Sequence, residues 1–527
     1  MKSFWNKATC ILVMAAIVLG TTACGGGTGS SAPASSAAAP AASSNASSAP
    51  AASAPAEDGK SYKFTFYRNG AWPTYPADGG SGYQVMKDAM KAYGLPDIDW
   101  EVVAIGGTEY YDKINVLAAS NSLPDAMNVN MVTLTSFADQ GLIIPLEDKL
   151  DQLPAVKDLM RPSELEAVTY KDHLYAFPVG YLEGSINGPN TDGLIIRQDW
   201  LDKVGMEVPG TIDEMYAVMK AFKEQDPDGN GQNDTYGYLG TKTTLFQDIF
   251  GAYGIQPSFW METPDGLRLG STLPATKDAL QVLQTWYAEG LIDPDIFTTD
   301  KALKDQNFAN SKGGIYEGYG FTGSPVQPET AALLSVTPTA KLSPVGKLVG
   351  PNGDYGRQES APGYGNIRSI SANCKDVDVL MQMLNWSVDQ AENGGFYLCS
   401  VGEEGIDFTL EDGGKKINQV STYDDIYAKG LGNPVRFLQV VDRRWLVDEA
   451  VACFEAFSDN YRENKCWKTT PSMLDYPDTC ENLFKEYLAK IVLGNLPVDA
   501  WDNYVKDFYA MGGDKIEQEV NEIVKAG

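Results

Sequence analysis

Residues 62–67 have the sequence YKFTFY and residues 99–105 have the sequence DWEVVAI, and a stretch with helical character, Gln84–Tyr93, lies between them. The first run alternates apolar with polar residues, as a half-buried strand does, and we expect a second strand over the other run. A strand, a helix and another strand in this order predict the beginning of an α/β fold.

The alternation continues directly after this unit. The sequence predicts a helix over Glu109–Ser120, a strand over Pro124–Asn130 and a helix over Val132–Gln140 that ends at Gly141. Strands that alternate with helices predict a mainly parallel sheet with helices on both of its faces.

The same pattern restarts after Pro178, so the sequence predicts two α/β lobes. Thr211 and Glu214 have the spacing of a helix capping box, and the residues behind them repeat apolar side chains at helical spacing. The other expected elements are a strand over Leu194–Arg197, a helix from Gln198, a helix over Thr276–Glu289 and a mostly helical end over Cys480–Ala526. A chain of 527 residues is also too long for one ordinary core.

The composition narrows the classes of partner. The chain has 70 acidic and 41 basic residues and a net charge of −29, so electrostatics would not draw it to nucleic acid or anionic lipid. An acidic surface suits neutral ligands or cations, and solubility alone explains the larger part of this charge.

Residues 1–23 have the features of a secretory signal peptide. Lys2 and Lys7 precede the apolar run Cys10–Leu19, which is too short to span a bilayer of about 30 Å as a helix. The small residues before Cys24 and the glycines after it resemble the bacterial lipoprotein box. The resemblance implies that Cys24 becomes the first mature residue and carries a lipid such as palmitate. An ordinary signal peptide that is cleaved elsewhere is the alternative.

Residues 24–57 are expected to form a disordered linker. Residues 25–56 are only Gly, Ser, Ala, Pro, Thr and one Asn, and such a stretch cannot bury enough apolar surface to offset its chain entropy. Together with a lipid on Cys24, this linker would hold the globular body near the outer face of a membrane.

The cysteines beyond Cys24 are odd in number, so at least one is expected to be free or paired between molecules. They are Cys374, Cys399, Cys453, Cys466 and Cys480. One bridge among the last three is compatible with export, and buried free thiols are the preferred interpretation.

The segment DPDGNGQND, at Asp226–Asp234, matches the first part of an EF-hand calcium loop. Gly231 permits the sharp turn, while Gly237 stands where such a loop ends on Glu, so the missing ligand would be Thr235, another segment or water. The candidate ligands are Asp226, Asp228, Asn230, the backbone carbonyl of Gln232, Asp234 and Thr235. A structural calcium ion is the expectation, and a polar turn without an ion is the alternative.

The sequence lacks the usual motifs of a serine hydrolase or a zinc enzyme. His173 is the only histidine and lies in a predicted hairpin turn, and no GxSxG or HExxH motif occurs. Paired carboxylates of the glycosidase type remain open, because sequence spacing cannot find them.

As a whole, the chain resembles the extracellular solute-binding proteins of ABC importers, family 1, in the large lipoprotein branch that binds carbohydrates. The resemblance lies in Leu123–Asp125, Gly141–Leu146, Leu174–Pro178, Arg197–Leu201, Thr211–Asp234, Glu289–Asp295, Gly402–Asp407 and Ile491–Gly513. It implies the α/β, type II periplasmic-binding-protein-like fold, with two lobes, a hinge and a ligand cleft between the lobes.

The same resemblance implies the domain boundaries. The N-terminal lobe would comprise residues 58–180 plus about 362–432, and the C-terminal lobe residues 181–361 plus about 433–527. The chain would cross between the lobes near residues 177–190, 362–365 and 430–436.

Candidate ligand contacts are aromatic and planar polar residues in Gly/Pro-rich loops, since aromatic rings cover the C–H face of a sugar and polar groups bind its hydroxyls. Trp72 and Tyr75 follow the first strand, where ligands of open α/β sheets bind. The full set is Trp72, Tyr75, Tyr181, Glu183, Trp260, Tyr316, Glu317, Tyr319, Arg444 and Trp445. Three tryptophans at helical spacing are assigned to the core: Trp200, Trp286 and Trp501.

These observations predict a non-enzymatic, lipid-anchored receptor on the extracellular face of a bacterial membrane. As a monomer it would capture a small polar solute, close its lobes and deliver the solute to ABC permease subunits. An oligosaccharide is the favoured solute. A surface hydrolase that uses paired carboxylates and a calcium-dependent adhesion module are the alternatives.

Overall fold

The computed structural model describes residues 60–70, 75–76, 78–106, 108–155, 157, 160, 162–178, 186, 190–325, 327–359, 367–434, 442–476 and 478–526. The predicted signal peptide, Cys24 and the predicted linker lie outside these residues, as do parts of the three predicted crossings. Among the described residues, the structure contains no helix with the length and hydropathy that crossing a membrane requires.

The first sheet forms where the YKFTFY and DWEVVAI segments predict it. Its order is β13-β3-β1-β2, in which β1 lies parallel to β2 and β3. The bounds are β1 Ser61–Asn69, β2 Asp97–Ile105, β3 Ala126–Val129 and β13 Ile367–Ile370. Alternate residues of β1 are buried, Tyr62, Phe64 and Phe66 among them, as the alternating pattern predicts. The last strand, β13, comes from a distant part of the chain and pairs antiparallel with β3.

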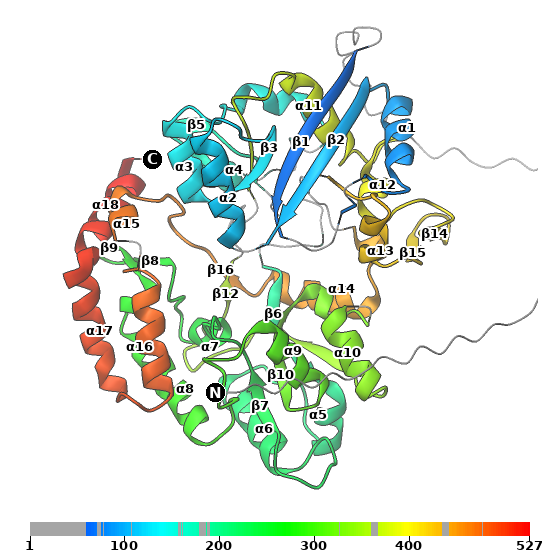
Figure 1. Ribbon diagram of the computed structural model, residues 1–527. Coiled ribbons are helices and arrows are strands. Elements are labelled where there is room, and N and C mark those ends of the chain that lie inside the picture. The colour runs from blue at the N-terminus through cyan, green and yellow to red at the C-terminus, as the bar shows by residue number, and fades with distance from the viewer. Residues whose placement is uncertain are drawn as a thin grey trace, which may run out of the picture. The chain divides into compact units, whose positions relative to one another are not determined.

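Helices pack against this sheet and close the first core (Figure 1). They are α1 Tyr83–Tyr93, α2 Thr108–Ala119, α3 Met131–Asp139, α4 Pro162–Ala167, α11 Val377–Trp386, α12 Phe396–Ser400 and α13 Tyr423–Ala428. The buried residues of this core come from two separate stretches of the chain, 62–177 and 367–431. Gly141 follows α3 with a φ of 66°, so the predicted glycine does end that segment.

The second sheet is mixed, which corrects the expectation of mainly parallel pairing. Its order is β11-β6-β10-β7, and only β10 and β7 run parallel, whereas β6 is antiparallel to both of its neighbours. The bounds are β6 Asp192–Arg197, β7 Tyr236–Leu239, β10 Gly313–Tyr319 and β11 Leu342–Val345. The apolar run of β6 is buried at nearly every position, and a fully buried strand has no alternation from which direction could be inferred.

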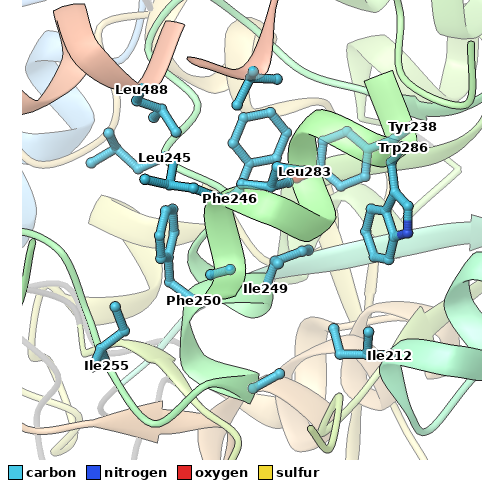
Figure 2. Packing of buried hydrophobic residues seen from close by; sticks show 14 of the residues in the cluster. Ile212, Tyr238, Leu245, Phe246, Ile249, Phe250, Ile255, Leu283, Trp286 and Leu488 are labelled. Carbon is cyan, nitrogen blue, oxygen red and sulfur yellow. The ribbon is translucent and has the colours of Figure 1, made fainter. Parts of the chain in front are cut away.

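The second core surrounds this sheet and includes the C-terminal helices (Figure 1). Its helices are α5 Gln198–Val204, α6 Ile212–Glu224, α7 Gln247–Ala252, α8 Ala275–Ala288, α16 Asn482–Val492, α17 Trp501–Phe508 and α18 Asp514–Ala526. Figure 2 shows Ile249 and Phe250 of α7, with Phe246 just before the helix, in one cluster with Trp286 and Leu488. The three tryptophans assigned to the core, Trp200, Trp286 and Trp501, all belong to this cluster.

The remaining elements lie outside these groups. The helices are α9 Lys301–Ala309, α10 Pro328–Val336, α14 Asp448–Ser458 and α15 Pro471–Asp475. The small two-stranded sheets pair β4 Thr169–Tyr170 with β5 His173–Leu174, β8 Trp260–Thr263 with β9 Gly266–Leu269, β12 Arg357–Gln358 with β16 Tyr461–Arg462, and β14 Phe408–Glu411 with β15 Lys416–Gln419. His173 lies beside a turn, as expected, and its Nδ1 is 2.6 Å from Glu147 Oε1.

The five cysteines within the described residues are all free thiols. Four are buried, and Cys480 is partly buried. Burial raises the pKa of Cys374 and Cys480 to about 12 each, so these thiols remain protonated at neutral pH. The preferred interpretation of buried free thiols is therefore confirmed.

Candidate functional site

A cavity of about 300 Å³ lies at one edge of the second sheet. Its lining combines carboxylates, cations, hydroxyls and one partly exposed tyrosine ring. The lining residues are Asp192, Thr241, Thr243, Thr244, Lys301, Lys304, Tyr316, Glu317, Gly318, Tyr319 and Arg357. This volume is at the lower end of the range of about 300–1,000 Å³ that small-molecule sites usually occupy.

The sheet places these residues together because three chain segments meet at this edge. Strand β10 ends at Tyr319, which pairs with Asp192 at the start of the antiparallel strand β6. Strand β7 runs parallel to β10 and leads directly into Thr241–Thr244. The carboxyl ends of β7 and β10 therefore point to the same place, where α/β sheets commonly bind ligands.

Arg357 is the cation of a buried ion-pair network behind the cavity. Its Nη1 contacts Asp248 Oδ2, and its Nη2 lies 3.0 Å from Glu317 Oε1. The other carboxylate oxygen of Glu317 accepts a hydrogen bond of 2.8 Å from Thr244 Oγ1. Burial alone would raise the pKa of Glu317, but the charges of Arg357 and Lys304 and the Thr244 bond outweigh it and lower this pKa.

The two lysines of α9 are also engaged within the protein. Lys304 is only 7% exposed, donates a hydrogen bond to the backbone oxygen of Glu317 and lies 3.9 Å from the centroid of the Tyr316 ring. Burial lowers the pKa of Lys304. Lys301 forms an ion pair of 2.6 Å with Asp305, which also accepts a hydrogen bond from the Tyr316 hydroxyl.

Asp192 differs from the other charged groups of the lining. Its side chain is exposed to solvent, and among the described residues it has no hydrogen-bond or ion-pair partner. Desolvation nevertheless raises the pKa of this carboxyl, while Arg357 opposes the rise and Glu317 adds to it. The Asp192 carboxylate can therefore accept hydrogen bonds from a ligand in the cavity.

Tyr319 supplies the apolar surface of the cavity. Its ring is partly exposed, and its hydroxyl donates a hydrogen bond of 3.1 Å to Gln327 Oε1. Phe321 contacts it edge-on, with ring centroids 5.8 Å apart. The bond and the contact hold the ring in one orientation.

Three of the predicted ligand contacts thus meet at one place, namely Tyr316, Glu317 and Tyr319. Of these, Tyr316 is 1% exposed, and its ring packs against Phe308 with a centroid distance of 4.6 Å. Tyr316 therefore forms the wall of the cavity, while Glu317 and Tyr319 present atoms to its interior.

Four other predicted contacts do not line this cavity. Tyr75 is buried, donates a hydrogen bond of 2.7 Å to the Gly430 carbonyl and accepts one from Trp100. Trp260 is 4% exposed and belongs to the second core.

Arg444 and Trp445 lie elsewhere, in a 3₁₀ turn at Arg443–Trp445. Arg444 pairs with Asp442 and donates a hydrogen bond of 2.6 Å to the Tyr397 hydroxyl. Trp445 stacks on Phe396 with a centroid distance of 5.6 Å. Trp72, Tyr181 and Glu183 lie outside the described residues.

The sequence search for aromatic loops missed most of the polar lining. The missed residues are Asp192, Thr241, Thr243, Thr244, Lys301, Lys304 and Arg357. Thr241–Thr244 could have been found, because they directly follow a strand, which is the criterion that selected Trp72. Arg357 had no such signal, since its partners Asp248 and Glu317 are distant in sequence.

The predicted cation loop folds as a tight turn after α6. Asp226 has a φ of 46°, and its carboxylate accepts hydrogen bonds from the backbone N–H groups of Asn230 and Gly231, at 3.1 and 2.9 Å. The Asn230 amide nitrogen lies 2.7 Å from Asp228 Oδ2 and 3.0 Å from Asp234 Oδ1. The side chains at positions 1, 3, 5 and 9 of the loop therefore do converge.

Asp234 and Thr235, both candidate ligands of the loop, have partners outside it. Lys312 pairs with Asp234 and lowers the pKa of that carboxyl. The Thr235 hydroxyl is buried and donates a hydrogen bond of 2.7 Å to the Phe222 carbonyl. Within the described residues, no group of three or more His, Cys, Asp or Glu side chains has the arrangement of a metal site.

Comparison with known proteins decides the family. The family of bacterial extracellular solute-binding proteins matches residues 75–391, more than half of the chain. The chain belongs to this family. Its members are binding proteins, which confirms the expectation of a binding protein and not an enzyme.

Individual relatives agree with this family. The chain is 24% identical over 447 residues to the polygalacturonan/rhamnogalacturonan-binding protein YtcQ of Bacillus subtilis, and the match covers 81% of this chain and 85% of YtcQ. An EF-hand mutant of the Streptococcus pneumoniae ABC-transporter substrate-binding protein FusA, solved with fructo-nystose, matches with a TM-score of 0.66 and 18% identity, over 88% of this chain and 99% of FusA.

The alginate-binding protein AlgQ2, solved without calcium ion, matches with a TM-score of 0.67 and 20% identity, over 88% of this chain and 98% of AlgQ2. These likenesses establish the fold, which is that of the type II periplasmic-binding-like solute-binding proteins, as the sequence predicts.

Proposed function

We propose that this solute-binding protein is the receptor of an ABC importer for an oligosaccharide, and that it captures the sugar in the cavity beside Tyr319. The observation that carries the proposal is the lining of this cavity. A rigid tyrosine ring lies beside accessible carboxylate and hydroxyl groups, which suits a ligand with an apolar face and a rim of hydroxyls. Two relatives support the same class of solute. YtcQ is named as a polygalacturonan/rhamnogalacturonan-binding protein, and FusA was solved with fructo-nystose.

Capture would proceed by closure of two lobes. Each of the two cores is built from two separate stretches of the chain, as expected if the chain crosses between lobes several times. The loop that holds Trp72 follows β1 of the first sheet, and the cavity lies on the second sheet. A sugar that touched both would stabilise the closed state over the open one, and the permease would accept the closed form.

The N-terminal segment would keep this receptor outside the cell. The signal peptide of residues 1–23 would be removed on export, and the lipid on Cys24 with the linker of residues 24–57 would then attach the receptor to the membrane. The attachment would let a monomer collect solute and return to its permease.

The binding experiment uses residues 25–527, which lack the lipid. Isothermal calorimetry and thermal shift with fructo-, gluco-, galacto-, xylo- and uronate oligosaccharides should find at least one ligand, and a ligand at 100 times its Kd stabilises the fold by about 2.7 kcal/mol. Tyr319→Ala should weaken binding of that ligand by tenfold or more, because it removes the aromatic surface on which the sugar stacks. Tyr476→Ala, at an exposed tyrosine outside the cavity, should leave the affinity unchanged. Failure of every saccharide to bind would contradict the proposal.

The loop Asp226–Asp234 would hold a structural calcium ion. The Asn230 amide lies between the carboxylates of Asp228 and Asp234, and with its oxygen and nitrogen exchanged it would present its oxygen to the point between them. The loop follows the C-terminus of α6, where a cation is also favoured.

Chelation tests this calcium proposal. Added calcium should raise the thermal midpoint of chelator-treated protein by several degrees, since an ion that binds only the folded state stabilises it. Asp228→Asn should abolish the rise, and Asp265→Asn, in an exposed turn elsewhere, should leave it intact. A midpoint that is indifferent to millimolar calcium would refute the proposal.

A further inference from the structure

The positive charges of the cavity are paired within the protein, whereas one negative charge is open to a ligand. Every cation among the described lining residues is already engaged: Arg357 by Asp248 and Glu317, Lys301 by Asp305, and Lys304 by the Glu317 carbonyl and the Tyr316 ring. Arg357 and Lys304 are also buried. A ligand carboxylate that entered the cavity would find cations whose charges are largely compensated.

Asp192 is the accessible charge without a partner in the described residues. It lies directly opposite Tyr319 in the register of β6 and β10, and cross-strand neighbours have Cβ atoms about 4.5–5.5 Å apart. The carboxylate therefore lies beside the ring. A sugar stacked on Tyr319 would place its hydroxyls where Asp192 accepts their hydrogen bonds.

We infer that this pairing of Asp192 with Tyr319 makes the site selective for neutral oligosaccharides and that it rejects fragments that carry uronate groups. The inference rests on the proposed function and narrows its substrate class. A neutral sugar gives Asp192 the O–H donors that it lacks, whereas a uronate brings a second carboxylate into a partly desolvated space where the cations of the described lining residues are already paired. The raised pKa of Asp192 is consistent with this, because it reflects first the desolvation of the carboxylate and then the nearby charge of Glu317.

This inference separates the chain from some of its relatives. YtcQ is a polygalacturonan/rhamnogalacturonan-binding protein and AlgQ2 an alginate-binding protein, while FusA was solved with fructo-nystose. The cavity beside Tyr319 would place this chain with the binders of neutral sugars, although the sequence identity of the chain to all three proteins is similarly low.

The test compares sugars that differ only in charge. Residues 25–527 are titrated with matched pairs, for example galactotriose and trigalacturonate with the same linkage, and with neutral fructans, each at low and high ionic strength. At least one neutral sugar should bind, and its uronate counterpart should bind at least tenfold more weakly. The gap should narrow at high salt, because screening weakens repulsion.

Asp192→Asn tests the assigned residue. The amide keeps an acceptor oxygen but removes the charge, so the preference for the neutral partner of a pair should fall at least threefold. Asp278→Asn is the matched control, since it removes the same charge from an exposed position on α8 outside the cavity.

The outcomes are distinct. A uronate that binds as tightly as its neutral counterpart, or more tightly, overturns the inference and leaves the proposed receptor function standing. An unchanged preference in Asp192→Asn removes the role of Asp192. If neither member of any pair binds, the proposed function itself fails, and the inference falls with it.

Discussion

At the scale of single residues, Arg357 determines how the polar side of the cavity is built. It is 3% exposed and compensates two carboxylates at once, Asp248 and Glu317. Buried charges are tolerated only when they are paired, so each member of the network depends on the others. The network also fixes Glu317 in place before a ligand arrives, and such preorganisation favours binding.

Arg357→Ala is expected to destabilise the protein by about 3–5 kcal/mol, because it leaves Asp248 and Glu317 as buried charges without their cation. Arg443→Ala is the matched control, since Arg443 and Glu455 form an exposed ion pair whose loss costs at most about 1 kcal/mol. Urea denaturation measures both variants, and equal losses of stability would contradict the role assigned to Arg357.

The pKa of Glu317 predicts how stability depends on pH. The pKa lies below 4.5 in the folded state, so its contribution is present above pH 4.5 and is lost as the pH falls through the lowered value. Denaturation of the wild type and Glu317→Gln between pH 3 and 7 should therefore show a shallower acid-side decline in the variant. Parallel curves for the two proteins would show that Glu317 does not titrate as described.

At the scale of elements, short local signals position the second sheet and its cavity. The box of Thr211 and Glu214 forms as predicted: Thr211 Oγ1 accepts from the Glu214 N–H at 3.2 Å, and Glu214 accepts from the Thr211 N–H at 3.1 Å. It begins α6, whose apolar side packs into the second core. A close approach also matters at Gly193 of β6, where an added Cβ would lie 2.1 Å from the Phe457 ring.

Thr211→Ala is expected to lower the free energy of unfolding by about 1 kcal/mol, the usual cost of losing an N-cap. The matched control is Ser335→Ala, at an exposed position of α10, which should change stability by less than about 0.5 kcal/mol. Chemical denaturation that found no loss for Thr211→Ala would mean that the box does not stabilise α6.

Local patterns also explain which elements were predictable. The strands β1, β2 and β3 and the helices α1, α2 and α3 were predicted within a few residues of their bounds, because alternation, helical spacing and glycine stops are local features. The direction of β6 was missed, since its buried apolar run carries no sign of which neighbour it joins. Likewise, aromatic residues in loops look alike in sequence whether they bind or pack, and only the fold separates Tyr319 from Trp260.

At the scale of the whole molecule, the family assignment and the cavity point to the same mechanism. The chain has two sheets and two large cores, and it belongs to the bacterial extracellular solute-binding proteins. The order of motifs along the sequence was enough to predict the family and the fold. Glu317 was predicted, but most of the polar lining was not, because Asp192 and Arg357 join Glu317 only in the folded chain.

Small-angle X-ray scattering of residues 25–527, with and without a saccharide found by calorimetry, tests the central claim most directly. The account predicts that the radius of gyration falls when the sugar binds, because the ligand favours the closed state. Tyr319→Ala at the same sugar concentration should remain at the larger value. A sugar that binds tightly and leaves the radius of gyration unchanged would contradict capture by lobe closure.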